Sequence, residues 1–182
     1  VAGMNWFDAI NHAMATVSTG GFSTKNNSVA FYNSMPFVQY IIIFFMLIAG
    51  TNFVLTYFAL KGKFSVAFKD EEFKYYSFFT LGFTAFIFIG LLVTTQLGVE
   101  HAFRDALFQV LTIITTTGYA TADYLTWSPA LTMIIFGLFF FGGSAGSTGG
   151  GIKTSTFALA TLNIFAVAKG KNRIQFRGRR VC

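Results

Sequence analysis

The sequence predicts an all-α membrane protein made of helix, pore-loop, helix repeats, with a third span that glycines interrupt. Three observations support this fold class. Hydrophobic residues make up 54% of the 182 residues and charged residues only 11%, proportions that are typical of membrane proteins. Long stretches without charge alternate with short basic segments. A hydroxyl-rich pattern with a glycine and an aromatic residue occurs twice.

Two uncharged stretches are each long enough to cross a bilayer. The first, residues 36–60, lies in a region without any charge between Lys25 and Lys61, and the second is residues 75–99. A spanning helix needs about 20 apolar residues. Both stretches are therefore predicted to be membrane-spanning helices.

The third apolar region, residues 129–168, is too long for one straight span. As a helix of about 40 residues it would measure roughly 60 Å, twice the hydrocarbon thickness. Six of the ten residues 142–151 are glycine, a poor helix former. We expect a break there, between helical halves at about residues 129–141 and 153–168. Irregular backbone at membrane depth needs protein or a water-filled cavity around it, so the break predicts a cavity.

The positive charges indicate the orientation of the chain. Ten of the 13 Lys and Arg residues lie in residues 61–74 or 169–180, and the positive-inside rule places both segments in the cytoplasm. Residues 1–30 and 100–128 then face outward. The net charge of +6 therefore reflects membrane sidedness, and no nucleic-acid partner is expected. The ten residues are Lys61, Lys63, Lys69, Lys74, Lys169, Lys171, Arg173, Arg177, Arg179 and Arg180.

The two hydroxyl-rich patterns belong to an internal repeat. The shift of 97 positions that separates Gly21 from Gly118 also aligns residues 18–24 with residues 115–121. In each copy a segment of helical character leads into the Thr/Ser run. The helical part of the second copy, residues 102–115, would measure roughly 20 Å, which is too short to cross but long enough to dip halfway and return.

This arrangement indicates a cation site. The carboxyl end of such a helix would lie at mid-membrane with about half a negative charge. The stretch after it has unpaired carbonyls, which replace the hydration shell of potassium in selectivity filters, and glycine allows the backbone to turn them inward. The candidate ion-binding residues are Ser18, Thr19, Gly20, Gly21, Phe22, Thr115, Thr116, Thr117, Gly118 and Tyr119.

Several of these features have a simpler interpretation. The pattern around Gly118 could be only a turn between an outer helix and a span, although two copies at equivalent positions argue against this. Asp8 and Asp105 match between the copies and are interpreted as helix-start or packing residues, with ion ligation as the alternative. Asp123 either attracts cations at the outer mouth or is an ordinary solvated charge.

Other functional classes fit the sequence less well. Residues 146–154 superficially resemble a phosphate-binding loop, but that motif needs adjacent Gly and Lys after a strand, and here Ile152 intervenes after a span. His12 and His101 have no Cys or second His near them, which argues against a catalytic metal. A purely structural subunit would have no reason to place glycine runs at membrane depth. A two-pore-loop cation channel subunit with lower K+/Na+ selectivity stays as an alternative.

With both hydroxyl-rich segments and the glycine-rich break in this order, the sequence resembles the Trk/Ktr family of bacterial potassium-uptake subunits over essentially its whole length. In that family four nonidentical repeats of potassium-channel type surround one pore. The resemblance assigns residues 1–60 to the second repeat, 61–74 to a cytoplasmic loop, 75–168 to the third repeat and 169–182 to a basic cytoplasmic segment. It places K+ at Thr19, Gly20, Thr116 and Thr117.

The resemblance also implies a gate. Residues 142–153 match the intramembrane loop that lies beneath the family's filter. Glycines pack little and so lower the cost of opening, and a permanent kink is the alternative. Lys153 would act as an electrostatic barrier, hold the loop closed or snorkel to the cytoplasmic interface. The predicted gate residues are Gly142, Gly143, Gly146, Gly149, Gly150, Gly151 and Lys153.

Further implications concern function and assembly. The resemblance implies potassium uptake across the cytoplasmic membrane, with no enzymatic step and no cofactor besides the transported K+. The expected partners are the lipid bilayer, a second copy in a homodimer, the first and fourth repeats of the same chain, and a cytosolic nucleotide-binding regulatory ring. The basic tail would meet either that ring or anionic lipid headgroups. Gly20 stands where the second copy has Thr117, so the selectivity for K+ over Na+ stays open. Two loops cannot close a four-fold ring, and this piece alone should not conduct.

Overall fold

The computed structural model describes residues 3–170, 174–176 and 179–181, and most of them are helical. Of the predicted basic segment, residues 171–173, 177–178 and 182 lie outside the described residues. The α-helices are α1 Trp6–Val17, α2 Pro36–Ala49, α3 Phe53–Leu60, α4 Phe64–Lys69, α5 Glu71–Thr94, α6 Val99–Ile114, α7 Pro129–Leu138 and α8 Thr154–Ala168. Two short 3-10 helices, η1 Ser28–Tyr32 and η2 Tyr124–Thr126, and an antiparallel pair of strands, β1 Ile174–Phe176 and β2 Arg179–Val181, complete the described elements. The predicted all-helical membrane fold is confirmed, and the strand pair near the end of the chain is an addition to it.

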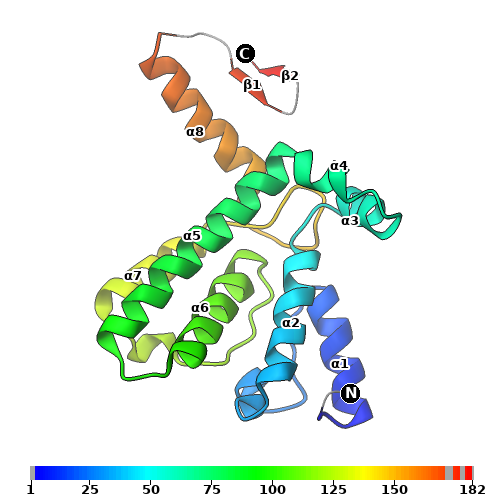
Figure 1. Cartoon of the computed structure of the whole chain (residues 1–182), viewed down its shortest axis with the longest axis vertical. Helices are drawn as coiled ribbons and strands as arrows, with labels where there is room; N and C mark the ends of the chain where they lie inside the picture. The colour runs from blue at the N-terminus through cyan, green and yellow to red at the C-terminus, as the bar shows by residue number, and fades with distance from the viewer. Residues whose placement is uncertain (1–2, 171–173, 177–178, 182) are drawn as a thin grey trace.

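The helix α6 lies at the centre of the fold. Figure 1 shows α5 alongside α6, and α1 alongside α2, and both α2 and α5 pack against α6. One hydrophobic core gathers α5, α6 and α7 around Ala106 and Val110, and a second gathers α2, η1 and α6 around Met46 and Phe108. Because α6 contributes to both cores, 11 of its 16 residues are buried.

One described helix, α5, is long and apolar enough to cross a membrane by itself. It corresponds to the second predicted span but begins four residues earlier. Asp70 fixes that start, since its side chain accepts a hydrogen bond of 3.1 Å from the backbone N–H of Phe73 and so caps the helix.

The prediction of one continuous helix over residues 36–60 is wrong. The region forms α2 and α3, which meet at an angle of 114°. The two helices are long and apolar enough to cross a membrane only when they are taken together. Thr51 ends α2 by bonding back to the carbonyl of Ile48 at 2.5 Å. Asn52 then caps α3 by accepting from the N–H of Val54 at 2.8 Å, as N-cap residues do. We call residues 50–52 the elbow.

The third apolar region is broken, as expected. The helices α7 and α8 are both shorter than a full span, and the segment between them passes from the middle of α5 to the end of α2 (Figure 1). Phe141 and Ile152 form an isolated bridge where the two chain segments meet. We call residues 142–153 the glycine loop.

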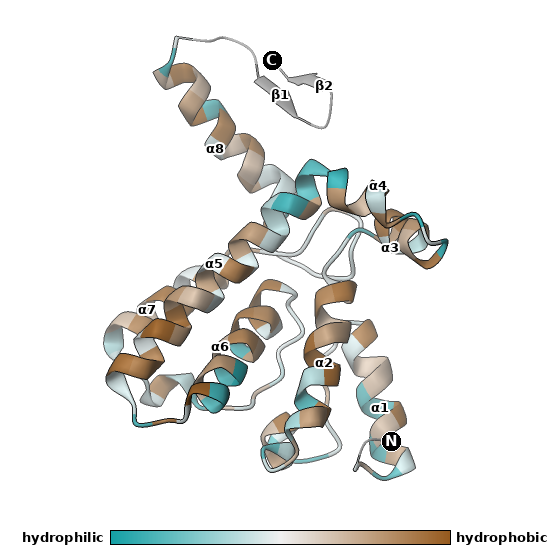
Figure 2. Cartoon of the chain, in the orientation of Figure 1, coloured by the Kyte–Doolittle hydropathy of each residue, from teal (hydrophilic) through white to brown (hydrophobic). Residues whose placement is uncertain are grey.

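Apolar side chains cover the outside of these helices. In Figure 2 hydrophobic residues dominate the helices, and hydrophilic residues gather where α4 meets α5 and at the start of α6. Phe78 and Phe136 leave 72% and 64% of their surface exposed, and Met133 leaves 78%. Such extensive exposure of large apolar side chains indicates contact with lipid or with further protein.

Candidate functional site

The two predicted filter segments follow directly on short helices. Residues 18–22, the first filter segment, come after α1, and residues 115–119, the second filter segment, come after α6. The last turn of neither helix contains a basic residue. The partial negative charge at each carboxyl end therefore points toward the filter segment without a neutralising side chain in that turn.

Both filter segments have the same unusual backbone. Thr19 and Gly21 have φ angles of 52° and 66°, and Thr116 and Gly118, at the equivalent positions, have φ angles of 56° and 83°. A left-handed residue therefore alternates with an ordinary one in each segment. Left-handed backbone of this kind is unusual for threonine, and its occurrence at equivalent positions shows that the two copies share a local fold.

The structure brings the two filter segments into contact. A Cβ atom added to Gly21 would lie only 1.9 Å from the carbonyl oxygen of Thr117, so a larger residue has no room there. Behind this contact, the hydroxyl of Tyr119 donates to the carbonyl oxygen of His12 at 3.2 Å, and the two rings stack. The predicted filter residues of the two copies therefore touch at Gly21 and Thr117.

The side chains of the two segments differ more than their backbones do. Phe22 leaves 80% of its surface exposed, whereas its counterpart Tyr119 is 1% exposed. The hydroxyls of Thr115 and Thr117 lie 2.7 Å apart and share a hydrogen bond, which Gly20 cannot reproduce in the first segment. The two segments are therefore chemically unequal, as the sequence indicates.

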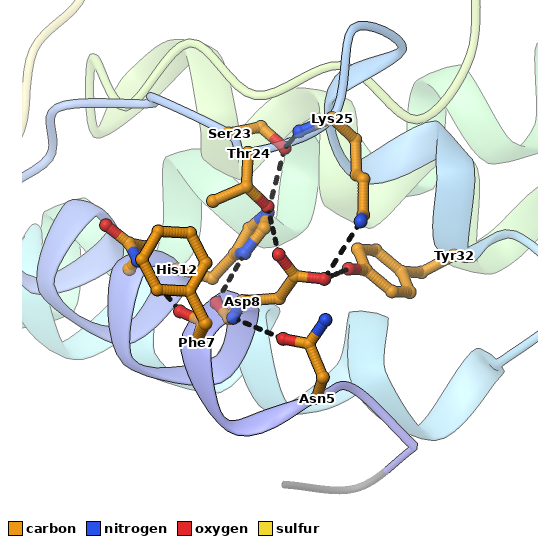
Figure 3. A network of polar contacts seen from close by, with 9 residues as sticks. Asn5, Phe7, Asp8, His12, Ser23, Thr24, Lys25 and Tyr32 are labelled. Atoms are coloured by element: carbon orange, nitrogen blue, oxygen red, sulfur yellow. Dashed lines mark hydrogen bonds and ion pairs between the residues drawn. The ribbon is translucent and has the colours of Figure 1, made fainter.

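A polar network joins residues 23–32, which follow the first filter segment, to α1 (Figure 3). The carboxylate of Asp8 is 4% exposed and accepts hydrogen bonds from Thr24 at 2.5 Å and from Tyr32 at 2.8 Å. The ammonium of Lys25 lies 3.1 Å from the same carboxylate. The bond from Thr24, helped by Tyr32 and Lys25 and opposed by burial, lowers the pKa of Asp8 to about 2. Asp8 therefore acts as a packing residue that ties residues 24–32 to α1.

Among the described residues, the second copy has no equivalent network. Asp105 pairs there with His101 on its own helix turn, at 3.3 Å. One oxygen of Asp105 and the hydroxyl of Thr121, the counterpart of Thr24, are buried without a hydrogen-bond partner among the described residues. Ala122 stands at the position of Lys25. Asp123 is exposed and caps η2 by accepting from the N–H of Leu125 at 3.0 Å.

The glycine loop touches the equivalent threonine of each filter segment. The hydroxyl of Thr19 donates to the carbonyl oxygen of Thr148 at 3.1 Å. The backbone N–H of Gly150 donates to the hydroxyl of Thr116 at 2.7 Å. The glycine loop therefore lies directly against both segments.

The two ends of the glycine loop are tied together. The N–H of Gly142 donates to the carbonyl of Ile152 at 2.8 Å, and a Cβ on Gly142 would lie 2.0 Å from the carbonyl oxygen of Gly150. Lys153 is half-buried, and its ammonium donates to the carbonyl of Gly149 within the loop. Of the alternatives for Lys153, this contact supports a role in holding the loop closed.

Two residues outside the predicted site also hold the glycine loop. The side-chain N–H of Asn52 donates to the carbonyl of Ala145 at 2.7 Å, and Glu72 accepts from the N–H of the same residue at 2.6 Å. The sequence predicts Asn52 in the first membrane span, residues 36–60, and Glu72 in the cytoplasmic loop, residues 61–74. The sequence contains a signal for the role of Asn52, because a residue that favours helix N-caps inside an apolar run indicates a break between two helices.

Comparison with known proteins identifies related chains. The family model described as TrkH: Cation transport protein matches residues 2–175. Among curated proteins, the Trk system potassium uptake protein TrkH of Halomonas elongata is 37% identical over 153 residues, covering 84% of this chain and 32% of that protein. The protein of the same name from Vibrio parahaemolyticus is 38% identical over 176 residues, covering 89% of this chain and 34% of the relative. The chain thus spans about a third of the length of the curated relatives that it matches.

The fold also matches a solved structure. The crystal structure of the potassium transporter TrkH from Vibrio parahaemolyticus aligns with a TM-score of 0.90 and 33% sequence identity. The alignment covers 99% of this chain and 40% of that one. The chain therefore shares its overall fold with part of a solved potassium transporter.

Proposed function

Because this chain belongs to the TrkH family of cation transport proteins, we propose that it supplies two quarters of a potassium filter, together with the gate below it. The observation that carries the proposal is the matched left-handed backbone at positions 19 and 21 and at positions 116 and 118. A helix end with partial negative charge precedes each pair. No enzymatic step and no cofactor is part of this function.

Potassium would pass the filter by exchanging water for carbonyl oxygens. In the first segment Thr19 and Gly20 would offer carbonyls, and in the second Thr116 and Thr117 would do so. Two further segments, from the remaining repeats of the longer chain, would complete the ring. A cation held by carbonyls gains only partial neutralisation, so binding stays weak enough for release.

The inequality of the two segments favours a second candidate, a cation pathway that discriminates less strictly between K+ and Na+. Gly20 cannot make the hydroxyl contact that Thr117 makes with Thr115, and Phe22 does not share the buried position of Tyr119. A filter with unequal walls would fit one ion size less exactly than four identical segments do.

The proposed setting is the cytoplasmic membrane, which the chain crosses several times. The pore loops would face outward, and residues 61–74 and 169–180 would face the cytoplasm. The proposed partners are a second copy in a homodimer and a cytosolic nucleotide-binding regulatory ring. Basic residues on this face suit either that ring or anionic lipid headgroups.

The test is ion flux through the full-length protein in liposomes. We expect Rb+ uptake that exceeds Na+ uptake and that increases with an inside-negative membrane potential. Uptake that needs a proton or sodium gradient would identify coupled transport instead of a passive pathway. Equal Rb+ and Na+ uptake would support the less selective candidate, and no cation uptake would contradict both.

The gate has its own test. Deleting residues 149–151 removes the part of the glycine loop that contacts Thr116, and we expect Rb+ flux to rise several-fold because the loop no longer reaches the filter. The deletion protein must be inserted normally, as judged by its yield and its elution as a single species. Unaltered or lower flux in such a protein would mean that the loop is a permanent kink.

A further inference from the structure

The first turn of α5 contains a buried carboxylate that reaches the glycine loop. Glu72 is 0% exposed, although Glu71 beside it is exposed. Its carboxylate oxygen accepts a hydrogen bond of 2.6 Å from the backbone N–H of Ala145. A charged acceptor makes this bond stronger than one between two neutral groups.

The same part of the loop is held from the other side by the elbow. The carbonyl of Ala145 accepts from the side chain of Asn52 at 2.7 Å. The N–H of Ser144 donates to the carbonyl of Gly50 at 2.9 Å, and the carbonyl of Gly146 accepts from the N–H of Phe53 at 3.0 Å. Residues 144–146 therefore lie between α5 and the elbow, with both backbone groups of Ala145 and the carbonyl of Gly146 occupied.

We propose that Glu72 is a positioning residue for ion transport, a latch that keeps the glycine loop closed against the filter. The proposal rests on the gate function proposed above. Moving the loop away separates Ala145 from Glu72 and leaves a carboxylate in a buried place without this donor, which is costly. The carboxylate of Glu72 thus raises the free-energy cost of opening the glycine loop, while the glycines of the loop lower it.

Glu72 is a cleaner test of the latch than Asn52. The side chain of Asn52 also caps α3 through Val54, so its removal would disturb the elbow itself. The contact between Glu72 and Ala145 lies away from Thr19 and Thr116, which hold the filter side of the loop. Removing Glu72 should therefore change how often the loop opens and leave ion selectivity alone.

The first experiment compares Rb+ and Na+ flux in the full-length protein with Glu72→Ala, Glu72→Gln and, as the control on the same turn, Glu71→Ala. We expect Glu72→Ala to raise Rb+ flux by about tenfold, the effect of losing one hydrogen bond to a charged group, with an unchanged ratio of Rb+ to Na+. Glu72→Gln keeps an acceptor and should raise flux by only about two- to threefold. Glu71→Ala keeps the bond between Glu72 and Ala145 and should raise Rb+ flux much less than Glu72→Ala does.

The second experiment measures opening without relying on flux. In a full-length background from which every other cysteine, Cys182 included, has been replaced by serine, Ser144→Cys places a thiol at a position that is 1% exposed. A membrane-impermeant maleimide added from the cytoplasmic side should label this thiol several-fold faster when Glu72→Ala is also present. Equal labelling rates, or flux that does not rise, would overturn the latch. A parent protein without Rb+ flux would contradict the proposed function instead, so the two failures are distinguishable.

Discussion

The two filter segments share a backbone conformation, but different parts of the molecule hold them in it. The helix before the first segment, α1, is exposed along one side, with Trp6 and Met14 each 71% exposed, and Asp8 anchors the segment through polar bonds. The helix before the second, α6, is mostly buried and contributes to two cores. Similar backbone angles can therefore be kept by a hydrogen-bond network in one copy and by packing in the other.

The largest difference should come from placing alanine at the two filter glycines. Gly21→Ala forces a Cβ to within 1.9 Å of the carbonyl oxygen of Thr117, whereas Gly118→Ala meets no atom within 4 Å and bears only the left-handed backbone cost. We expect Gly21→Ala to abolish Rb+ uptake in liposomes. Gly118→Ala should reduce the Rb+/Na+ ratio by roughly tenfold, because about 1–2 kcal/mol of backbone strain acts on the filter alone. Gly82→Ala in α5, which has no left-handed angle to keep and meets no described atom within 4 Å, is the control, and equal effects at the two glycines would contradict the contact between the segments.

A smaller difference should separate the two supporting threonines. Thr24→Val removes the hydroxyl that bonds to Asp8, and the apparent melting temperature should fall by about 1–3 °C. Thr121→Val removes a buried hydroxyl that has no partner among the described residues, so it should be neutral or stabilising. Thermal unfolding of the purified full-length variants measures both effects. A larger loss for Thr121→Val would mean that packing does not replace the polar network in the second copy.

The smallest effect concerns pH. The folded-state pKa of Asp8, about 2, lies below its ordinary value of 3.8. The network therefore contributes stability above about pH 4 and loses it only as the pH falls toward 2. Between external pH 5 and 8 Asp8 stays ionised, so Asp8→Asn and the parent protein should show parallel pH profiles of Rb+ flux. A step in the parent's profile that Asp8→Asn removes would contradict the lowered pKa.

Much of this comparison could be predicted from the sequence because it rests on local patterns. The hydroxyl and glycine residues of both filter segments lie close together in the chain, and the glycines at 142–151 can hardly continue a helix. The sequence did not predict the break between α2 and α3, because a stretch of 25 uncharged residues indicates a single span. Only three of these residues, Gly50, Thr51 and Asn52, favour a turn. The role of Glu72 depends on a loop some 70 residues later in the chain, and no periodicity encodes such a contact.

The elbow couples the proposed opening of the glycine loop to hydration. When the glycine loop leaves, the carbonyl of Gly50, the side chain of Asn52 and the N–H of Phe53 all lose the partners that they have in the closed arrangement. Polar groups in such a place need water in exchange. The open protein therefore holds more bound water than the closed one, and an excluded osmolyte on the cytoplasmic side should favour closure and slow Rb+ flux. Osmotic strength would thereby act through the elbow, the same residues that hold the glycine loop in place.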